Sequence, residues 1–209
     1  MSFIENLNWR YAAKSFGGGS VSQENLDKIL DAVRLAPSSF GPQPYHVTVV
    51  TNKVMLENLK KYAKGNERKF ETASHVLVFS YRKDVASRFK QLQEMQKRKD
   101  NMLRNIGWGI QYVMPIIAWL RMGRYLTMCD WASSQTYVAL GFAISACAEL
   151  QVDSCPMEGF NARKFSKILN LPNHIKPVVL LALGTRDNND SSLKYPKTRF
   201  SKKDLFDFK

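Results

Sequence analysis

The sequence has few of the residues that metal sites and disulfide frameworks require. It contains only three cysteines and three histidines among 209 residues, and no two cysteines form a Cys-x-x-Cys pair. Cys129, Cys147 and Cys155 are therefore expected to be reduced thiols, as in an intracellular protein. The histidines do not cluster in the sequence either, so we expect neither a bound metal nor a histidine-based catalytic triad.

Long hydrophobic runs are also missing. The most apolar tract, residues 106–120, is interrupted by glycine, glutamine and proline, so it is too short and too broken to span a membrane. The first residues lack the charged segment followed by an apolar one that marks a signal peptide. These absences predict a cytoplasmic protein that makes no membrane contact.

Acidic residues are scarce relative to basic ones. The 31 lysines and arginines outnumber the 18 aspartates and glutamates, which gives a net charge of +13. Such a surplus favours an anionic partner, such as a nucleotide or a nucleic acid, although many of these charges can simply be solvated. A basic nucleic-acid-binding module is one reading, and residues 194–209 add to it with six basic and two acidic side chains. No helix-turn-helix or RNA-binding signature accompanies them.

The apolar content is sufficient for one core. Hydrophobic residues make up 44% of the chain, and no linker or repeat divides it, so we expect a single domain over residues 1–209. Apolar and β-branched runs predict strands at residues 45–50, 75–81 and 177–183. Helices are predicted between Ser22 and Pro37 and at residues 56–64, 83–104, 127–150 and 161–170. Strands separated by helices indicate a layered α/β or α+β domain.

Two pairs of basic residues could hold an anion. Arg10 and Lys14 are four residues apart and would share one face of a helix or helical turn. Lys197 and Arg199 would share one face of an extended arm. The planar guanidinium of arginine suits a phosphate, and the compact ammonium of lysine suits a ring edge that becomes anionic. By composition alone, surface charge is the simpler explanation of both pairs.

Five short motifs, which follow one another along the chain, give these pairs a context. They are Arg10-Tyr11-Ala12-Ala13-Lys14, Pro37-Ser38-Ser39 with Gln43-Pro44-Tyr45-His46, Asn66-Glu67-Arg68-Lys69, Pro156-Met157-Glu158-Gly159-Phe160 and Lys197-Thr198-Arg199. Together they resemble the FMN-dependent nitroreductase family. The similarity is greatest to the branch of oxygen-insensitive NAD(P)H nitroreductases and dihydropteridine reductases, and it extends over nearly the whole chain.

The resemblance implies a fold and an activity. The fold would be α+β, a three-layer α/β/α sandwich with a mostly antiparallel central sheet. A long buried interface helix at residues 127–150 and an exchanged C-terminal arm would join two chains into a homodimer. The enzyme would bind FMN and use NADH or NADPH to reduce a small-molecule acceptor, with no nucleic acid involved. Nitroaromatics, quinones or pteridine-like compounds would be reduced by ping-pong hydride transfer through flavin N5. A flavin-binding protein without a redox role is the alternative.

The resemblance also implies how the phosphate end of the cofactor is held. Arg10, Lys197 and Arg199 would bind the phosphate, while Lys14 would approach the flavin ring. Many relatives have a serine two residues after the first arginine, as a further phosphate ligand, but this chain has Ala12. Backbone N–H groups or water would then replace that hydroxyl.

At the ring end, the resemblance implies that Asn66 and Lys69 hydrogen-bond the ring edge. The backbone N–H groups of Glu158 and Gly159 would point at flavin N5 and O4, so no side chain is expected to act as a catalytic acid or base. Glycine at residue 159 would allow the backbone to approach the ring closely. Further cofactor contacts are expected from Tyr11, Ala12, Pro37, Ser38, Ser39, Gly41, Pro156 and Met157.

Two further segments would complete the site. The loop Pro37-Ser38-Ser39 would pack on the flavin of the neighbouring subunit, although by itself it could be a helix end followed by a turn. Gly41 stands where many relatives have an asparagine. Residues that would cover the flavin, or else pack in the core, are Trp119, Met122 and Tyr125.

Overall fold

A four-stranded sheet is the middle layer of the molecule, which is described by a computed structural model over residues 1–97 and 127–209. Its strands are β1 (Tyr45–Val50), β2 (His75–Arg82), β3 (Asp153–Met157) and β4 (Ile175–Gly184). They lie in the order β1-β2-β4-β3, and every neighbouring pair is antiparallel. The predicted antiparallel central sheet is therefore confirmed.

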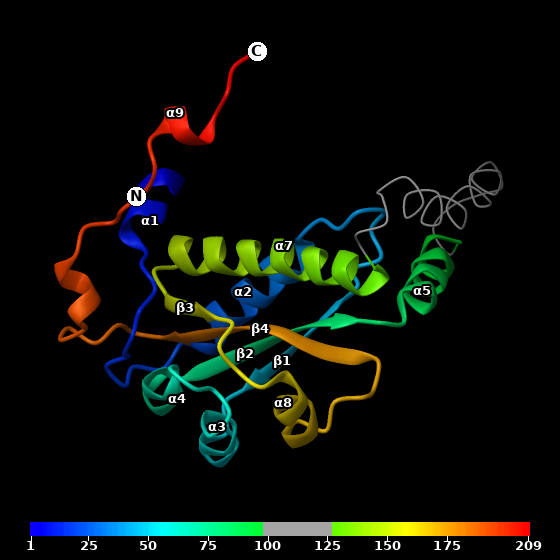
Figure 1. The fold of residues 1–209 in the computed structure, drawn as a ribbon, viewed down its shortest axis with the longest axis horizontal. Helices are drawn as coiled ribbons and strands as arrows, with labels where there is room; N and C mark the ends of the chain where they lie inside the picture. Colours follow the sequence, from blue (N-terminus) through cyan, green and yellow to red (C-terminus); the bar gives the residue numbers. More distant parts are fainter. Residues whose placement is uncertain (98–126) are drawn as a thin grey trace.

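Helices cover both faces of this sheet (Figure 1). The helices of the described residues are α1 (Phe3–Trp9), α2 (Gln23–Leu35), α3 (Lys53–Lys60), α4 (Glu67–Thr72), α5 (Val85–Lys97), α7 (Met128–Glu149), α8 (Ala162–Ile168) and α9 (Lys202–Leu205), with a 3-10 helix, η2 (Ser191–Lys194). On one face of the sheet lie α2 and α7, and on the other lie α3, α4 and α8. This arrangement confirms the α+β class and the three-layer α/β/α sandwich.

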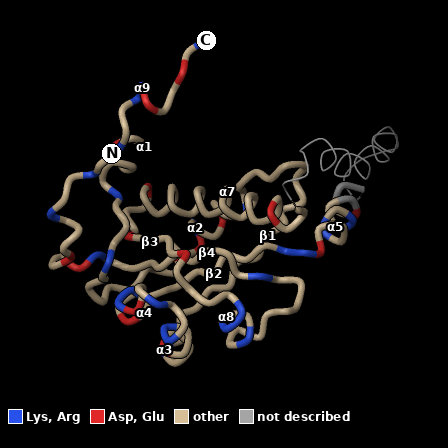
Figure 2. Tube along the Cα trace, viewed as in Figure 1, with Lys and Arg blue, Asp and Glu red and all other residues tan. Residues whose placement is uncertain are grey.

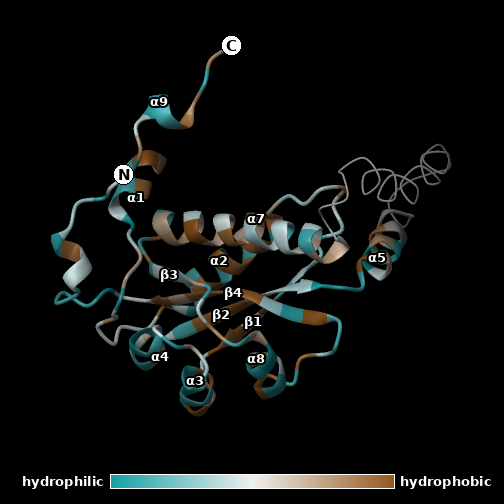
Figure 3. Cartoon of the chain, in the orientation of Figure 1, coloured by the Kyte–Doolittle hydropathy of each residue, from teal (hydrophilic) through white to brown (hydrophobic). Residues whose placement is uncertain are grey.

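A hydrophobic core lies on each face of the sheet, because successive side chains of a strand point to opposite faces. In β2, Leu77 and Phe79 pack with α2 and α7, whereas Val76 and Val78 pack with the opposite helices. Strand β4 repeats this alternation over residues 180–183, and all of these side chains are fully buried. Because both faces are covered, consecutive positions are apolar, as Figure 3 shows for the middle of the sheet.

The helix α7 is the long apolar helix that the sequence predicts. It begins after Thr127, whose side chain forms a capping box with Asp130. The residues buried on its inner side are Ala132, Thr136, Ala139, Leu140, Ala143, Cys147 and Ala148. Its outer side is also apolar, yet Tyr137 and Val138 are each 39% exposed and Phe142 is 42% exposed. The described residues therefore leave an apolar face of α7 exposed. Within the described residues, no helix is both long and apolar enough to cross a membrane.

The edge strand β3 has no counterpart among the predicted strands. It contains Pro156, which cannot donate a hydrogen bond to a neighbouring strand and so argues against a strand in the sequence. An edge position tolerates proline, and β3 is at the edge of the sheet. Strand β4 likewise begins at Ile175, before Pro177 rather than at it. A register shift against β2 leaves Val178 as an extra residue, which is a bulge of the kind that accommodates proline.

Several helix boundaries also differ from the predictions. The helices α1 and α4 are 7 and 6 residues long, too short for a clear periodic pattern, and neither is predicted. The side chain of Asn52 caps α3, which therefore begins before the predicted residue 56. Ser22 and Asn161 cap α2 and α8 as expected. Of the predicted helix at 83–104, α5 provides the part up to Lys97, and the remainder lies outside the described residues.

The close contact between Gly184 and Phe16 should make Gly184→Ala destabilising. A Cβ at residue 184 would lie 2.7 Å from Cδ1 of Phe16, whose ring is only 3% exposed and has little room to move. Overpacking of this kind costs about 1–3 kcal/mol, or roughly 2–12 °C in Tm for a chain of this length. The Tm of the apoprotein, measured by circular dichroism, checks this expectation.

The control is the double variant Gly184→Ala with Phe16→Leu. Leucine removes the ring atoms that the new methyl group would contact, so the two substitutions together should cost less than the sum of their separate effects. Strictly additive costs would show that the contact with Phe16 is not the cause.

Candidate cofactor site

A pocket of about 420 Å³ lies between the residues that follow α1 and the C-terminal arm, which we define as residues 185–209. It is lined by Asn8, Trp9, Arg10, Tyr11, Ala12, Lys14, Arg186, Ser192, Leu193, Tyr195, Pro196, Lys197 and Arg199. Five of these 13 residues are lysine or arginine, and none is acidic. Figure 2 shows basic positions both after α1 and along the arm. The size suits a small molecule, and the charge suits an anion.

The cations of this pocket repel one another, and burial together with this repulsion lowers the pKa of two of them. Burial lowers the pKa of Arg10, and the nearby Arg199 lowers it further. Burial also lowers the pKa of Lys197, with smaller contributions from Arg10 and Arg199. In addition, Nε of Arg10 is buried and has no hydrogen-bond partner among the described residues. A bound anion would offset the repulsion and could accept a hydrogen bond from this nitrogen.

The predicted helical turn through Arg10 and Lys14 is wrong. Arg10 is the C-cap of α1 and has extended dihedrals of φ −67° and ψ 142°. The chain then runs beside β3, where Ala12 forms a parallel bridge with Ser154. In an extended chain, residues at i and i+4 also share a face. Arg10 and Lys14 therefore both line the pocket, although the backbone that places them is extended.

The arm closes the pocket by crossing the end of α1. The ammonium of Lys197 donates hydrogen bonds to the carbonyl oxygens of Leu7, at 2.6 Å, and Arg10. These carbonyls are at the C-terminal end of α1, where cations are favoured. Arg199 lines the same pocket, and its guanidinium donates to the carbonyl of Thr198. The structure thus brings together the two basic pairs that lie at opposite ends of the sequence.

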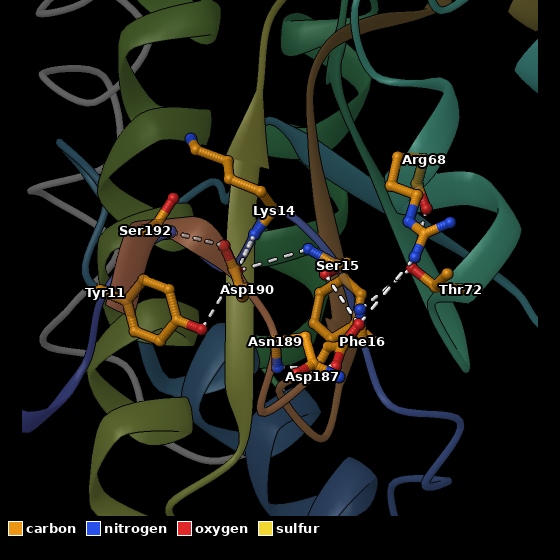
Figure 4. A network of polar contacts seen from close by, with 10 residues as sticks. All are labelled: Tyr11, Lys14, Ser15, Phe16, Arg68, Thr72, Asp187, Asn189, Asp190 and Ser192. Atoms are coloured by element: carbon orange, nitrogen blue, oxygen red, sulfur yellow. Dashed lines mark hydrogen bonds and ion pairs between the residues drawn. The ribbon is translucent and has the colours of Figure 1, made fainter. Parts of the chain in front are cut away.

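A buried carboxylate lies behind the pocket (Figure 4). Asp190, which is 4% exposed, accepts hydrogen bonds from the backbone N–H groups of Lys14 and Ser192 and from the hydroxyl of Tyr11. A longer contact of 3.4 Å comes from the N–H of Ser15. The segment after α1 and the arm are therefore joined through one side chain.

Arg186 is a pocket residue that the motifs do not reveal. Its guanidinium lies 4.2 Å from the ring centroid of Trp9 and 4.8 Å from that of Tyr11. The carboxylate of Asp153 in β3 pairs with it at 2.7 Å and is 4% exposed. In the sequence, the only signal is an arginine two residues after the end of an apolar strand. Its partners are too distant along the chain to be inferred from that pattern.

A second group of predicted residues meets at the end of β3. The ammonium of Lys69, a residue only 8% exposed, donates to Oδ1 of Asn66 at 2.9 Å. The amide of Asn66 in turn donates to the carbonyl of Gly159 at 2.9 Å. A Cβ at residue 159 would lie 3.0 Å from Nδ2 of Asn66, so glycine permits this close approach. Lys69 and Asn66 therefore hold the loop after β3 in place.

The carboxylate of Glu158 is engaged by α7. The hydroxyl of Tyr137 donates to its Oε1 at 2.5 Å. Burial, together with this hydrogen bond, raises the pKa of Tyr137 to about 12. The hydroxyl of Tyr137 thus fixes the side chain of Glu158, while the backbone of Glu158 begins the loop after β3. Within the described residues, no three histidine, cysteine, aspartate or glutamate side chains gather as a metal site would require.

Comparison with known proteins decides the family. A model described as "Nitroreductase family" matches residues 7–185, which is most of the chain and includes four of the five motifs. The chain belongs to the nitroreductase family. The family expected from the ordered motifs is thereby confirmed, and the remaining motif, Lys197-Thr198-Arg199, lies beyond the matched residues.

Other members of the nitroreductase family resemble the chain over nearly its full length. YfkO of Bacillus subtilis, provisionally named an NAD(P)H nitroreductase, is 32% identical, over 97% of this chain and 95% of its own. The crystal structure of YdfN from Bacillus subtilis, provisionally named a nitroreductase, has a TM-score of 0.85 at 22% identity and covers 99% and 98% of the two chains. A provisionally named nitroreductase from Exiguobacterium sibiricum, solved in complex with FMN, has a TM-score of 0.81 at 20% identity and covers 100% and 98%.

In this nitroreductase-family chain, the loop at residues 37–41 does not reach the cationic pocket. The N–H of Ser39 donates to Gln135, near the start of α7, whereas α1 packs at the other end, where Asn6 bonds to Glu149. These two positions on α7 are 14 residues apart, or roughly 20 Å along the helix axis. Within one chain, the loop and the pocket are therefore separate.

The other residues predicted to contact the cofactor lie in the core, in β3, in the loop at residues 37–41 or outside the described residues. Met157 is 3% exposed and packs in the core beside Cys155, so its side chain contributes to the fold at this position. Pro156 is only partly buried and lies in β3, directly before the loop that Asn66 holds. Gly41 has a φ of +78°, a conformation that favours glycine. Trp119, Met122 and Tyr125 lie outside the described residues.

Proposed function

We propose that this protein is an FMN-dependent oxidoreductase that uses NADH or NADPH to reduce nitroaromatics, quinones or pteridine-like acceptors. The observation that carries the proposal is the pocket of five cations without an acidic residue, in a chain of the nitroreductase family. The phosphate of FMN is a dianion, and the orphaned Nε of Arg10 is a donor of the type that it needs. When bound, FMN supplies ping-pong hydride transfer through its N5 atom.

The residues divide into a phosphate end and a ring end. At the phosphate end, Arg10, Lys197 and Arg199 bind the dianion, and Arg186 adds positive charge to the wall of the pocket. The absence of a serine hydroxyl at Ala12 is compensated by this concentration of cations. Lys14 extends from the same wall toward the ring.

At the ring end, the backbone N–H groups of Glu158 and Gly159 serve the ring. The hydrogen bonds from Lys69 through Asn66 to the carbonyl of Gly159 support this role, because they fix the peptide that must approach the ring. The side chain of Glu158 is already held by Tyr137, which supports a mechanism without a carboxylate base. Lys69, which donates to Asn66, would place positive charge beside the ring edge when FMN is bound.

A homodimer is part of this proposal. The exposed outer face of α7 and the exposed aromatic residues of the arm give each chain apolar surface to bury against a second copy. The loop at residues 37–41 lies at the wrong end of α7 to reach its own pocket, which supports contact with the flavin of the other subunit. We propose that residues 1–209 of each subunit act as one FMN-binding domain, because the pocket needs both the segment after α1 and the arm.

The direct test identifies the flavin and its reductant. Purified protein, reconstituted if necessary, should release FMN and not FAD on denaturation, because the cations that line the pocket suit a terminal phosphate dianion. Anaerobic addition of NADH or NADPH should bleach the flavin absorbance, and a nitroaromatic or quinone should restore it. Release of FAD, or failure to bind any flavin, would contradict the proposal. Bound FMN that neither nucleotide reduces would favour a flavin-binding protein without redox function.

A further inference from the structure

Asp190 connects the two walls of the cationic pocket without lining it. The N–H of Lys14 donates to its Oδ2 at 2.6 Å and the hydroxyl of Tyr11 at 3.1 Å, while the N–H of Ser192 donates to Oδ1 at 2.9 Å. Tyr11, Lys14 and Ser192 line the pocket, whereas Asp190 does not and lies between these three residues (Figure 4). The bonds span about 176 residues of sequence, so this carboxylate fixes the segment after α1 relative to the arm.

The carboxylate is held in its charged form. Burial opposes ionisation of Asp190, but the hydrogen bonds from Ser192, Lys14, Tyr11 and Ser15 outweigh it, and its pKa is lowered. These donors are neutral, so none of the pocket cations is consumed in compensating the charge. The arrangement therefore secures the pocket walls while leaving the guanidinium and ammonium groups for an anion.

We propose that Asp190 is a positioning residue that gives the site its preference for a phosphorylated flavin. It holds the backbone of Lys14 and Ser192 and the hydroxyl of Tyr11, so that Arg10 on one wall and Lys197 and Arg199 on the other converge on one phosphate. A site fixed in advance loses less freedom when its ligand binds. This inference rests on the proposed binding of FMN and adds the residue that determines selectivity for its phosphate.

Electrostatics alone predicts the opposite effect of removing this charge. Loss of an anion behind a cationic pocket should strengthen phosphate binding. If Asp190 acts by positioning, its replacement by asparagine should weaken phosphate binding. In either orientation of its amide, the asparagine would turn its NH₂ group toward an N–H or O–H donor, so that hydrogen bond would be lost. The sign of the change in FMN affinity therefore separates the two effects.

The experiment compares FMN with riboflavin, which lacks only the phosphate. Apoproteins of the wild type and Asp190→Asn are titrated with each flavin, and quenching of flavin fluorescence gives the Kd. For Asp190→Asn, we expect the Kd of FMN to rise about tenfold or more, as for loss of one charge-assisted contact, and that of riboflavin to change less than about threefold. Inorganic phosphate should raise the Tm of the wild-type apoprotein and have little effect on the variant.

Two further variants serve as controls. Asp187→Asn removes the same charge from the same turn. Asp187 accepts hydrogen bonds from Ser15 Oγ and the N–H of Asn189 and lies 3.9 Å from Arg68, but no hydrogen bond joins it to Lys14 or Tyr11 among the described residues. This variant should keep the wild-type ratio of the two Kd values within about twofold. Tyr11→Phe removes one donor to Asp190 without changing charge, and should shift the ratio in the same direction as Asp190→Asn by about threefold. It keeps the test usable if Asp190→Asn fails to fold.

The outcomes separate this inference from the proposed function. A wild-type protein that binds neither flavin would overturn both. A wild-type preference for FMN that persists in Asp190→Asn and Tyr11→Phe would overturn the role of Asp190 alone. Equal weakening of both flavins, or tighter binding of FMN, would also overturn it, because the first indicates general loss of structure and the second simple electrostatics. A selective loss for FMN and phosphate supports the positioning role.

Discussion

Deletion of residues 194–209 is expected to leave a folded monomer that does not retain FMN. The deletion removes Lys197 and Arg199, and two charge-assisted hydrogen bonds at the lower end of their range, about 1.5 kcal/mol each, amount to about 100-fold in affinity. It also removes Tyr195, Phe200 and Phe208, which are 76%, 79% and 94% exposed and would be available to a second chain. Fluorescence titration with FMN and sedimentation at low micromolar concentration measure the two losses.

Full-length variants separate the two roles of the deleted residues. Lys197→Ala with Arg199→Ala should lose FMN while remaining dimeric, because the aromatic residues are still present. Lys202→Ala with Lys203→Ala removes the same charge from α9, whose residues do not line the pocket, and should leave the Kd of FMN nearly unchanged. A truncated protein that stays dimeric and loaded with flavin would show that the arm has neither role.

Asp153→Asn is expected to cause a large loss of stability. The substitution leaves the guanidinium of Arg186 without its partner, in a pocket wall that holds four other cations. Breaking a buried ion pair in this way costs about 3–5 kcal/mol, or roughly 6–20 °C in Tm for a chain of this length. Thermal unfolding of the apoprotein, followed by circular dichroism, provides the measurement.

An exposed pair in α2 is the matched control. Asp31 and Arg34 lie 2.9 Å apart, with side chains that are 63% and 67% exposed. Asp31→Asn makes the same chemical change, and should cost at most about 1 kcal/mol because water screens the pair. Similar losses of Tm in the two variants would mean that burial of Asp153 is not what makes its ion pair important.

The features predicted correctly are those encoded by neighbouring residues. The strands β2 and β4 are continuous apolar runs because helices cover both faces of the sheet, and α7 has both a capping residue and a long apolar sequence. The family motifs also group Arg10, Lys14, Lys197 and Arg199, and all four line one pocket in the structure. Their binding of FMN stays a prediction.

The features that were not predicted depend on partners far along the chain. A spacing of four is shared by one face of a helix and one face of a strand, so Arg10 and Lys14 do not distinguish the two backbones. Strand β3 could not be predicted, because it contains polar residues and Pro156. A strand tolerates proline when it lies at the edge of a sheet, and that position is known only from the structure. Asp190 and Arg186 look like ordinary charges of a polar tail, because their partners at residues 9–14 and 153 come from distant parts of the sequence.

The division of the pocket between residues 10–14 and 186–199 also affects when the cofactor can be loaded. No N-terminal fragment that ends before residue 186 contains any part of the second wall, and a growing chain reaches Arg199 only after 189 further residues have followed Arg10. At 5–20 residues per second, that interval is roughly 10–40 s. At the proposed site, loading of FMN would therefore follow synthesis of the arm, and each new molecule would pass through an apo state. In that state, any free phosphate would compete for the same cations.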